Sequence, residues 1–210
     1  MNDMSKPPSD IAFSPSVKAI QSRKGSRESY RRMEERAGWQ TEISDDLATF
    51  IADQRSFFLA TASQEGIPYI QHRGGPRGFL HVVDESTLAF VDFRGNRQYI
   101  TQGNLAENPS AHIFLIDYAR RQRINIWGSA NVVENDPQLL ERLTPPDYKA
   151  QIEQVIVFHV AAWDANCPQH IPVRLDAEDV EDALGDEDDW DGDEDAEDED
   201  SERKSKRYGT

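Results

Sequence analysis

Residues 88–104 read LAFVDFRGNRQYITQGN, and this stretch predicts a strand, an anion-binding turn and a short helix in succession. Leu88 to Val91 form an apolar run of strand length. The turn over residues 92–97 places two arginines and an asparagine around Gly95. Guanidinium groups are planar, bidentate donors for phosphate, glycine lets a ligand approach the backbone, and a helix over residues 96–107 would add N–H groups. Since such a loop is more often a solvated turn, both readings stay open.

The negative charge of the chain is concentrated near its C-terminal end. The formal net charge is -16 over 210 residues, and residues 176–210 hold 18 acidic and four basic residues. The remainder is nearly neutral, which argues against a nucleic-acid partner. So acidic a segment cannot bury enough apolar surface to fold alone, and we expect a disordered tail that either aids solubility or docks on a basic partner.

Other features of composition predict a cytoplasmic protein. Cys167 is the only cysteine, so no intrachain disulfide can form. The N-terminal residues contain acids and prolines rather than the apolar run of a signal peptide. No stretch approaches the roughly 20 apolar residues of a membrane span, so we expect no membrane partner.

Apolar periodicity predicts a mainly β domain with flanking helices (α+β). Residues 1–25 are polar and interrupted by prolines, which predicts a flexible arm, and the domain is expected over residues 26–175. Helices are expected at 26–37, from Ser44 to about 54, at 96–107 and from Asp136. Seven strands are expected at 57–62, 68–72, 79–83, 88–92, 111–117, 123–133 and 155–163. Their short connections favour an antiparallel barrel, closed or nearly so.

Six motifs occur in a fixed order along this pattern. They are FFLAT at 57–61, QHRGG at 71–75, DFRGNRQ at 92–98, NLAENP at 104–109, RINIWG at 123–128 and NCPQHI at 166–171. Together they resemble the pyridoxamine 5'-phosphate oxidase-like family of FMN-binding split barrels, and most of all its branch of oxidase-related flavin-binding proteins. The resemblance covers about residues 30–175. It implies an antiparallel split β-barrel and a homodimer that holds two FMN molecules at its interface.

The resemblance also implies a clamp for the FMN phosphate. Arg73 matches the arginine that the family supplies from a strand. The second part of the clamp usually reads Ser-Arg-Lys, and here Asn96, Arg97 and Gln98 stand in its place. Gln98 removes one positive charge, for which Arg94 could compensate from the same loop.

Further candidate cofactor-binding residues surround the expected flavin ring. The isoalloxazine needs donors near N1, O2 and N5, and the candidates are Gln71, His72, Asn166 and Gln169, with Gly74 and His170 beside them. Arg123 and Trp127 are expected to approach the ring from the second subunit. Whether Gln122 or Arg123 takes the ring-contacting position depends on a one-residue register that stays open. His72 and Trp127 each have an alternative as purely structural strand residues.

The expected function is that of an FMN-dependent oxidoreductase, which transfers hydride or electrons to or from an unidentified small molecule. A reduced nicotinamide is a candidate electron donor. The alternative is a non-catalytic flavin-binding or redox-sensing module with a partner-binding tail, and a deazaflavin or haem is a third possibility. No catalytic residue can be assigned, because no general base stands out. Cys167 and His170 are too few ligands for a metal site.

Overall fold

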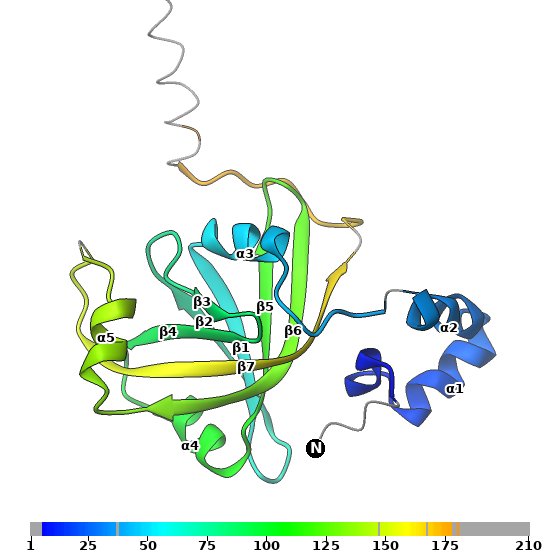
Figure 1. Ribbon diagram of the computed structural model, residues 1–210, viewed down its shortest axis with the longest axis horizontal. Coiled ribbons are helices and arrows are strands. Elements are labelled where there is room, and N and C mark those ends of the chain that lie inside the picture. The colour runs from blue at the N-terminus through cyan, green and yellow to red at the C-terminus, as the bar shows by residue number, and fades with distance from the viewer. Residues whose placement is uncertain (1–5, 37, 147, 167, 178–179, 181–210) are drawn as a thin grey trace, which may run out of the picture. The chain divides into compact units, whose positions relative to one another are not determined.

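The structure is a computed structural model that describes residues 6–36, 38–146, 148–166, 168–177 and 180. The chain divides into two units, Met1–Val173 and Arg174–Thr210. In the described part of the first unit, seven strands form one antiparallel sheet in the order β2-β1-β5-β6-β7-β4-β3 (Figure 1). The strands are β1 (Ser56–Ala62), β2 (Pro68–Gly74), β3 (His81–Asp84), β4 (Thr87–Phe93), β5 (Ser110–Asp117), β6 (Gln122–Val133) and β7 (Ile152–Asn166).

Helices flank this curled sheet (Figure 1). They are the 3-10 helix η1 (Pro8–Ile11) and the α-helices α1 (Pro15–Lys24), α2 (Arg27–Arg36), α3 (Asp45–Ala52), α4 (Ile100–Glu107) and α5 (Pro137–Leu143). Among the described strands β2 and β3 are the two edges, so strand pairing does not close the barrel. The expectation of a mainly β, antiparallel split barrel with flanking helices is confirmed.

Strand β4 is buried from Thr87 to Asp92, on both faces of the sheet. Leu88 and Phe90 belong to the main core, which also contains apolar residues of α3, β1, β5, β6 and β7. The alternate residues of β4 pack in a second cluster with Leu143 of α5. A strand covered on both sides needs apolar residues at successive positions, and this explains the run that begins at Leu88.

The outer face of β1, β2, β5 and β6 carries half-buried aromatic side chains. Phe58 lies 5.6 Å from the His72 ring and 6.4 Å from the Phe114 ring, measured between centroids. Burial lowers the pKa of His112 on the same face, which keeps its imidazole neutral. Ile70 is 62% exposed there. This face therefore carries apolar side chains that are incompletely covered within one protomer.

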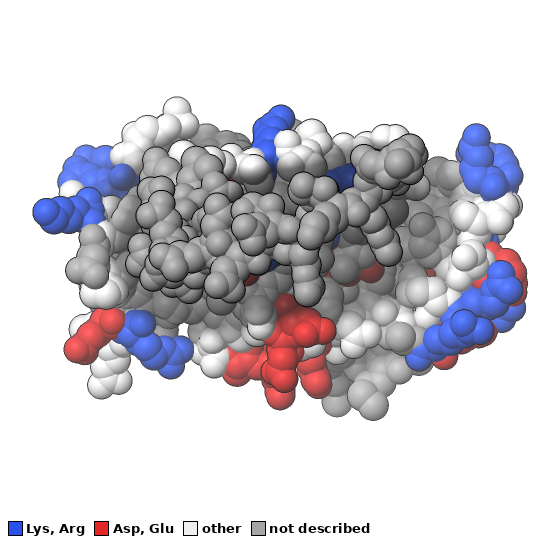
Figure 2. Space-filling model, turned by 90° about the horizontal axis from the view of Figure 1, so that it is seen from above, with Lys and Arg blue, Asp and Glu red and all other residues white. Residues whose placement is uncertain are grey.

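The N-terminal region, expected to be a flexible arm over residues 1–25, contains regular structure in its described part. It contains η1 and α1, and Ser14 caps α1 by accepting a hydrogen bond of 3.3 Å from the Val17 amide. The polar helix α2 follows, and Arg31 pairs with two glutamates on its surface. Figure 2 shows positive and negative side chains together at the end of the molecule where Figure 1 places α1 and α2. Trp39 then stacks on Trp127 of β6, with 4.4 Å between centroids.

Helix α4 begins at Ile100, four residues later than expected. The backbone φ angles of Arg97 and Tyr99 are 62° and 56°, in the left-handed region. A right-handed helix cannot run through such residues. The turn after β4 is therefore longer than expected, and its side chains are free to line a cavity.

The second unit is described only at residues 174–177 and 180, where the Val180 amide donates to the Asp176 carbonyl. The rest of the expected acidic tail lies outside the described residues. Within the described chain, no helix combines the length and the apolar character that a membrane crossing requires.

Gly128 occupies the irregularity at which β6 shifts its register against β7. A Cβ atom there would lie 2.0 Å from the His159 carbonyl oxygen and 2.7 Å from the Phe158 ring. We expect Gly128→Ala to lower the free energy of unfolding by about 2–3 kcal/mol through overpacking, as measured by urea denaturation. In the control Gly103→Ala, the new Cβ has no atom within 4 Å, so stability should be equal or higher. Equal stability of both variants would contradict this assignment.

Candidate functional site

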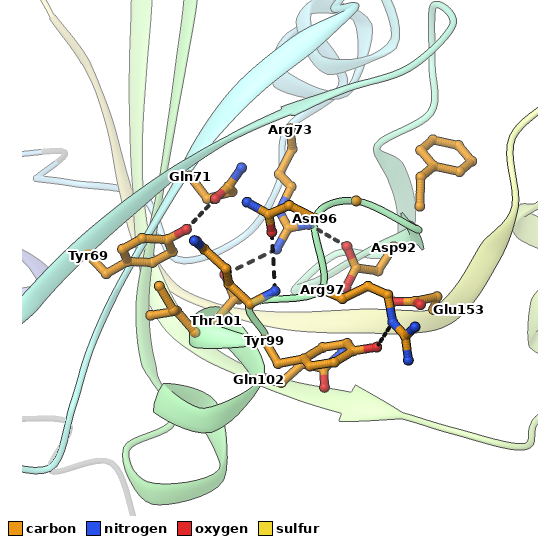
Figure 3. A pocket seen from close by; sticks show the side chains of 14 residues that line it. Tyr69, Gln71, Arg73, Asp92, Asn96, Arg97, Tyr99, Thr101, Gln102 and Glu153 are labelled. Carbon is orange, nitrogen blue, oxygen red and sulfur yellow. Dashed lines mark hydrogen bonds and ion pairs between the residues drawn. The ribbon is translucent and has the colours of Figure 1, made fainter.

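A cavity of about 200 Å³ lies between β2, the end of β4, the turn that follows it, the first turn of α4 and β7 (Figure 3). Strand alternation directs Tyr69, Gln71 and Arg73 of β2 to this side of the sheet. The full lining consists of Tyr69, Gln71, Arg73, Asp92, Phe93, Gly95, Asn96, Arg97, Gln98, Tyr99, Ile100, Thr101, Gln102 and Glu153. Most of these side chains can form hydrogen bonds.

An ion pair between Arg73 and Asp92 crosses the inner end of the cavity. The second Nη group of Arg73 donates to the Thr101 Oγ1 over 3.1 Å. The other carboxylate oxygen of Asp92 accepts from the Gln154 Nε2 at 2.8 Å. The Arg73 Nε is buried and has no hydrogen-bond partner among the described residues. Hydrogen bonds to β4 and α4 thus fix the position of the Arg73 side chain.

Arg97 lies at the exposed rim of the cavity, beside Tyr99 (Figure 3). Its Nε donates to the Tyr99 hydroxyl at 2.9 Å, and this hydrogen bond is the main cause that raises the pKa of Arg97. Because the bond uses Nε, the two Nη groups of Arg97 are left to form a bidentate fork for an anion. Tyr99 therefore positions the arginine.

The remaining residues of the turn fall into two groups. Asn96 and Gln98 line the cavity, and the Asn96 Oδ1 accepts from the Gln98 amide at 3.2 Å. Arg94 is absent from the lining. Its Nη1 donates to the Gln151 Oε1 at 2.7 Å, and its Nε lies 3.8 Å from a Glu153 carboxylate oxygen. In this arrangement Arg94 is turned towards β7.

The structure brings together five of the predicted site residues: Gln71, Arg73, Asn96, Arg97 and Gln98. His72 points to the opposite face of β2, next to Phe58. Gly74 ends that strand outside the lining. Neither residue contacts this cavity within one protomer.

The predicted residues of the later motifs lie elsewhere. Arg123 lines a separate cavity of about 490 Å³ together with Trp163. Trp127 is on the outer face, covered by Trp39. Gln169 and His170 are exposed after β7, and the Asn166 side chain lies outside the described residues. Both Gln122 and Arg123 line the larger cavity, so the structure leaves their register open.

Sequence reasoning missed several residues of the lining, including Tyr69, Asp92, Tyr99, Thr101, Gln102 and Glu153. Tyr69 could have been predicted from the alternation of β2, because it lies two residues before Gln71 and therefore on the same face as Gln71 and Arg73. An acid at the end of the apolar run was also a signal for Asp92, since a buried carboxylate needs a partner. We find no sequence signal for Glu153, which comes from a strand far along the chain.

This arrangement fits an anionic group that accepts several hydrogen bonds. Two guanidinium groups and two side-chain amides of the turn line one cavity. Its volume of about 200 Å³ is below the roughly 300–1,000 Å³ of complete small-molecule sites. The cavity of one protomer is therefore sized for a phosphate and the atoms next to it. No group of three or more metal-ligating side chains occurs among the described residues.

Several solved structures are similar to this chain at low sequence identity. HupZ of Group A Streptococcus is 16% identical, with 63% of this chain and 99% of that chain covered and a TM-score of 0.46. An FMN-binding protein of Syntrophomonas wolfei is 12% identical, with 72% and 97% covered and a TM-score of 0.44. HutZ, the haem storage protein of Vibrio cholerae, is 16% identical, with 56% and 89% covered and a TM-score of 0.38. At these scores the similarities carry no argument about ligand or activity.

Family membership comes from the sequence itself. Comparison with curated proteins finds no match. The profile of the pyridoxamine 5'-phosphate oxidase family matches residues 43–180, which is well over half of the chain and includes every strand of the sheet. The protein belongs to the pyridoxamine 5'-phosphate oxidase family.

Proposed function

We propose that this protein binds FMN by its phosphate at the cavity beside α4 and acts as an oxidoreductase on a small molecule. The observation that carries the proposal is the meeting of Arg73 and Arg97 at one cavity. These arginines come from different parts of the chain. Charge-assisted hydrogen bonds from guanidinium groups are the strongest that side chains offer a phosphate.

Different residues of the chain would hold different parts of the cofactor. Arg73, Arg97, Asn96 and Gln98 would hold the phosphate, and Gln71 lies next to them for the ribityl chain. Bound FMN would supply hydride or electron transfer. A reduced nicotinamide remains the proposed electron donor, and a cytoplasmic location remains a prediction.

We further propose that the protein is a homodimer and that a second copy covers the outer face of the sheet. The exposed Ile70 and the half-buried Phe58 and Phe114 support this, because an apolar face is a typical homodimer interface. Burial also raises the pKa of Asp164 on that face, so the face disfavours charge. Residues such as Arg123 would then lie close to the flavin ring held by the other copy.

Loss of the rim arginine should weaken cofactor binding. We expect Arg97→Ala to raise the Kd of FMN by about 10- to 100-fold, since it removes a charged hydrogen-bonding group. Quenching of FMN fluorescence during titration measures this Kd. Arg142→Ala, which removes an exposed arginine outside the cavity, should bind like the wild type. A wild-type protein that neither shows flavin absorption bands nor quenches FMN would refute the proposed function.

Activity is tested separately from binding. Anaerobic mixing of the FMN-loaded protein with a reduced nicotinamide should bleach the flavin band, and turnover should follow when an acceptor is added. If FMN binds but no physiological donor reduces it, the protein is the non-catalytic flavin-binding or redox-sensing module instead.

A charge on the outer face should separate the two copies. Ile70 is 62% exposed in one protomer, so Ile70→Glu should leave each protomer folded but place a carboxylate in the proposed interface. Analytical ultracentrifugation should then find a dimer for the wild type and a monomer for the variant. Val82→Glu, at a 37% exposed position of edge strand β3, should remain dimeric. A monomeric wild type or a dimeric Ile70→Glu would contradict the proposal.

A further inference from the structure

The carboxylate of Asp92 is a buried charge beside the proposed phosphate site. The residue is only 6% exposed at the end of β4. One of its oxygens pairs with Arg73 and the other accepts from the Gln154 Nε2, so neither oxygen is left for a ligand (Figure 3). Asp92 therefore acts on a bound anion through Arg73 and through its own charge.

The ion pair changes what Arg73 offers to a ligand. One N–H of each Nη group is held by Asp92 or Thr101, and the buried Nε has no hydrogen-bond partner among the described residues. The negative charge of Asp92 cancels most of the guanidinium charge at the distance of a ligand. Arg73 can therefore donate a well-oriented hydrogen bond but adds little attraction for an anion.

The four charged residues of the lining balance formally. They are Arg73, Arg97, Asp92 and Glu153, two of each sign. Glu153 also acts electrostatically on Arg97. A dianionic phosphate in such a cavity is held by hydrogen bonds more than by net charge, and its binding is weaker than two uncompensated arginines would give.

We infer that Asp92 positions Arg73 and also cancels most of its charge, so that the site binds its phosphate ligand more weakly than two uncompensated arginines would. The inference rests on the proposed function for the identity of the ligand as FMN. Its physical content concerns any phosphate at this cavity. Arg97 is then the arginine whose charge acts most on the ligand.

The variant Asp92→Asn tests this inference because asparagine has the same shape and its Oδ1 still accepts from Arg73, while its Nδ2 can donate to the Gln154 Oε1 once the Gln154 amide turns over. We expect it to bind FMN and inorganic phosphate roughly tenfold more tightly than the wild type, because the cancelling charge is gone. Its affinity should also fall more steeply between low and high salt. Fluorescence quenching measures FMN, and isothermal titration calorimetry of the full chain measures inorganic phosphate.

Two controls separate charge from structure. Riboflavin has no phosphate, so its affinity should be the same for wild type and Asp92→Asn. Asp136→Asn makes the same change of charge at the N-cap of α5, outside the cavity. Asparagine caps a helix as well as aspartate does, so FMN binding should be unchanged.

A double variant keeps the inference testable if Asp92→Asn alone does not fold. Arg73→Gln combined with Asp92→Asn removes both charges and keeps the formal balance of the lining. We expect its affinity for inorganic phosphate to exceed that of Arg73→Gln alone, because Asp92 no longer opposes the anion, and to stay below that of the wild type, because the Arg73 hydrogen bond is lost. Arg73→Gln alone should bind phosphate much more weakly, because Asp92 is then uncompensated.

Each result decides a different question. Folded Asp92→Asn that binds phosphate as weakly as the wild type, or more weakly, overturns the inference and leaves Asp92 with an orienting role alone. Should neither protein bind FMN, the proposed function fails, and titration with inorganic phosphate still decides the role of Asp92. Absence of binding of both FMN and inorganic phosphate, in both proteins, overturns the two proposals together.

Discussion

The burial of β4 on both faces is the constraint on which the site depends. The strand is fixed between the main core and α5, and it ends in the buried Asp92. Because the strand cannot shift, Asp92 has a fixed position from which it holds Arg73 of β2. The turn after β4 is anchored at its other end by α4, whose Thr101 also accepts from Arg73. The packing of the core therefore fixes the position of Arg73 in the site through its ion pair with Asp92.

The strands of this fold could be predicted because each one leaves a local signal. Alternating burial in β1 and β5 gives a period of two, and the short turns fix the antiparallel pairing. Helix α1 left no such signal, since Gln21 is its only buried residue. The late start of α4 also left no signal in the sequence. The two residues with left-handed backbone angles, Arg97 and Tyr99, are not glycines. Polar helices and unusual backbone angles depend on contacts distant in sequence.

The site was predictable to the extent that one segment or one strand face defines it. Asn96, Arg97 and Gln98 are adjacent, and Gln71 and Arg73 share one face of β2. The same parity places His72 on the opposite face, which strand alternation alone would have given. Partners from other strands, such as Glu153 of β7, emerge only when the sheet is assembled. The arginines of the site could therefore be predicted from the sequence, but the effect on them of charged residues from other strands could not.

The two halves of the expected flavin site are separated by the sheet of a single protomer. The cavity beside α4 lies on one side of β2, while His72 and Trp127 belong to the outer face. Within one protomer, Trp127 already stacks against Trp39 from the segment after α2. If a second copy is to bring this strand to the ring, its approach must accommodate the stacked pair. The N-terminal segment is then part of the same face, and its aromatic side chains help to determine which surface the second copy meets.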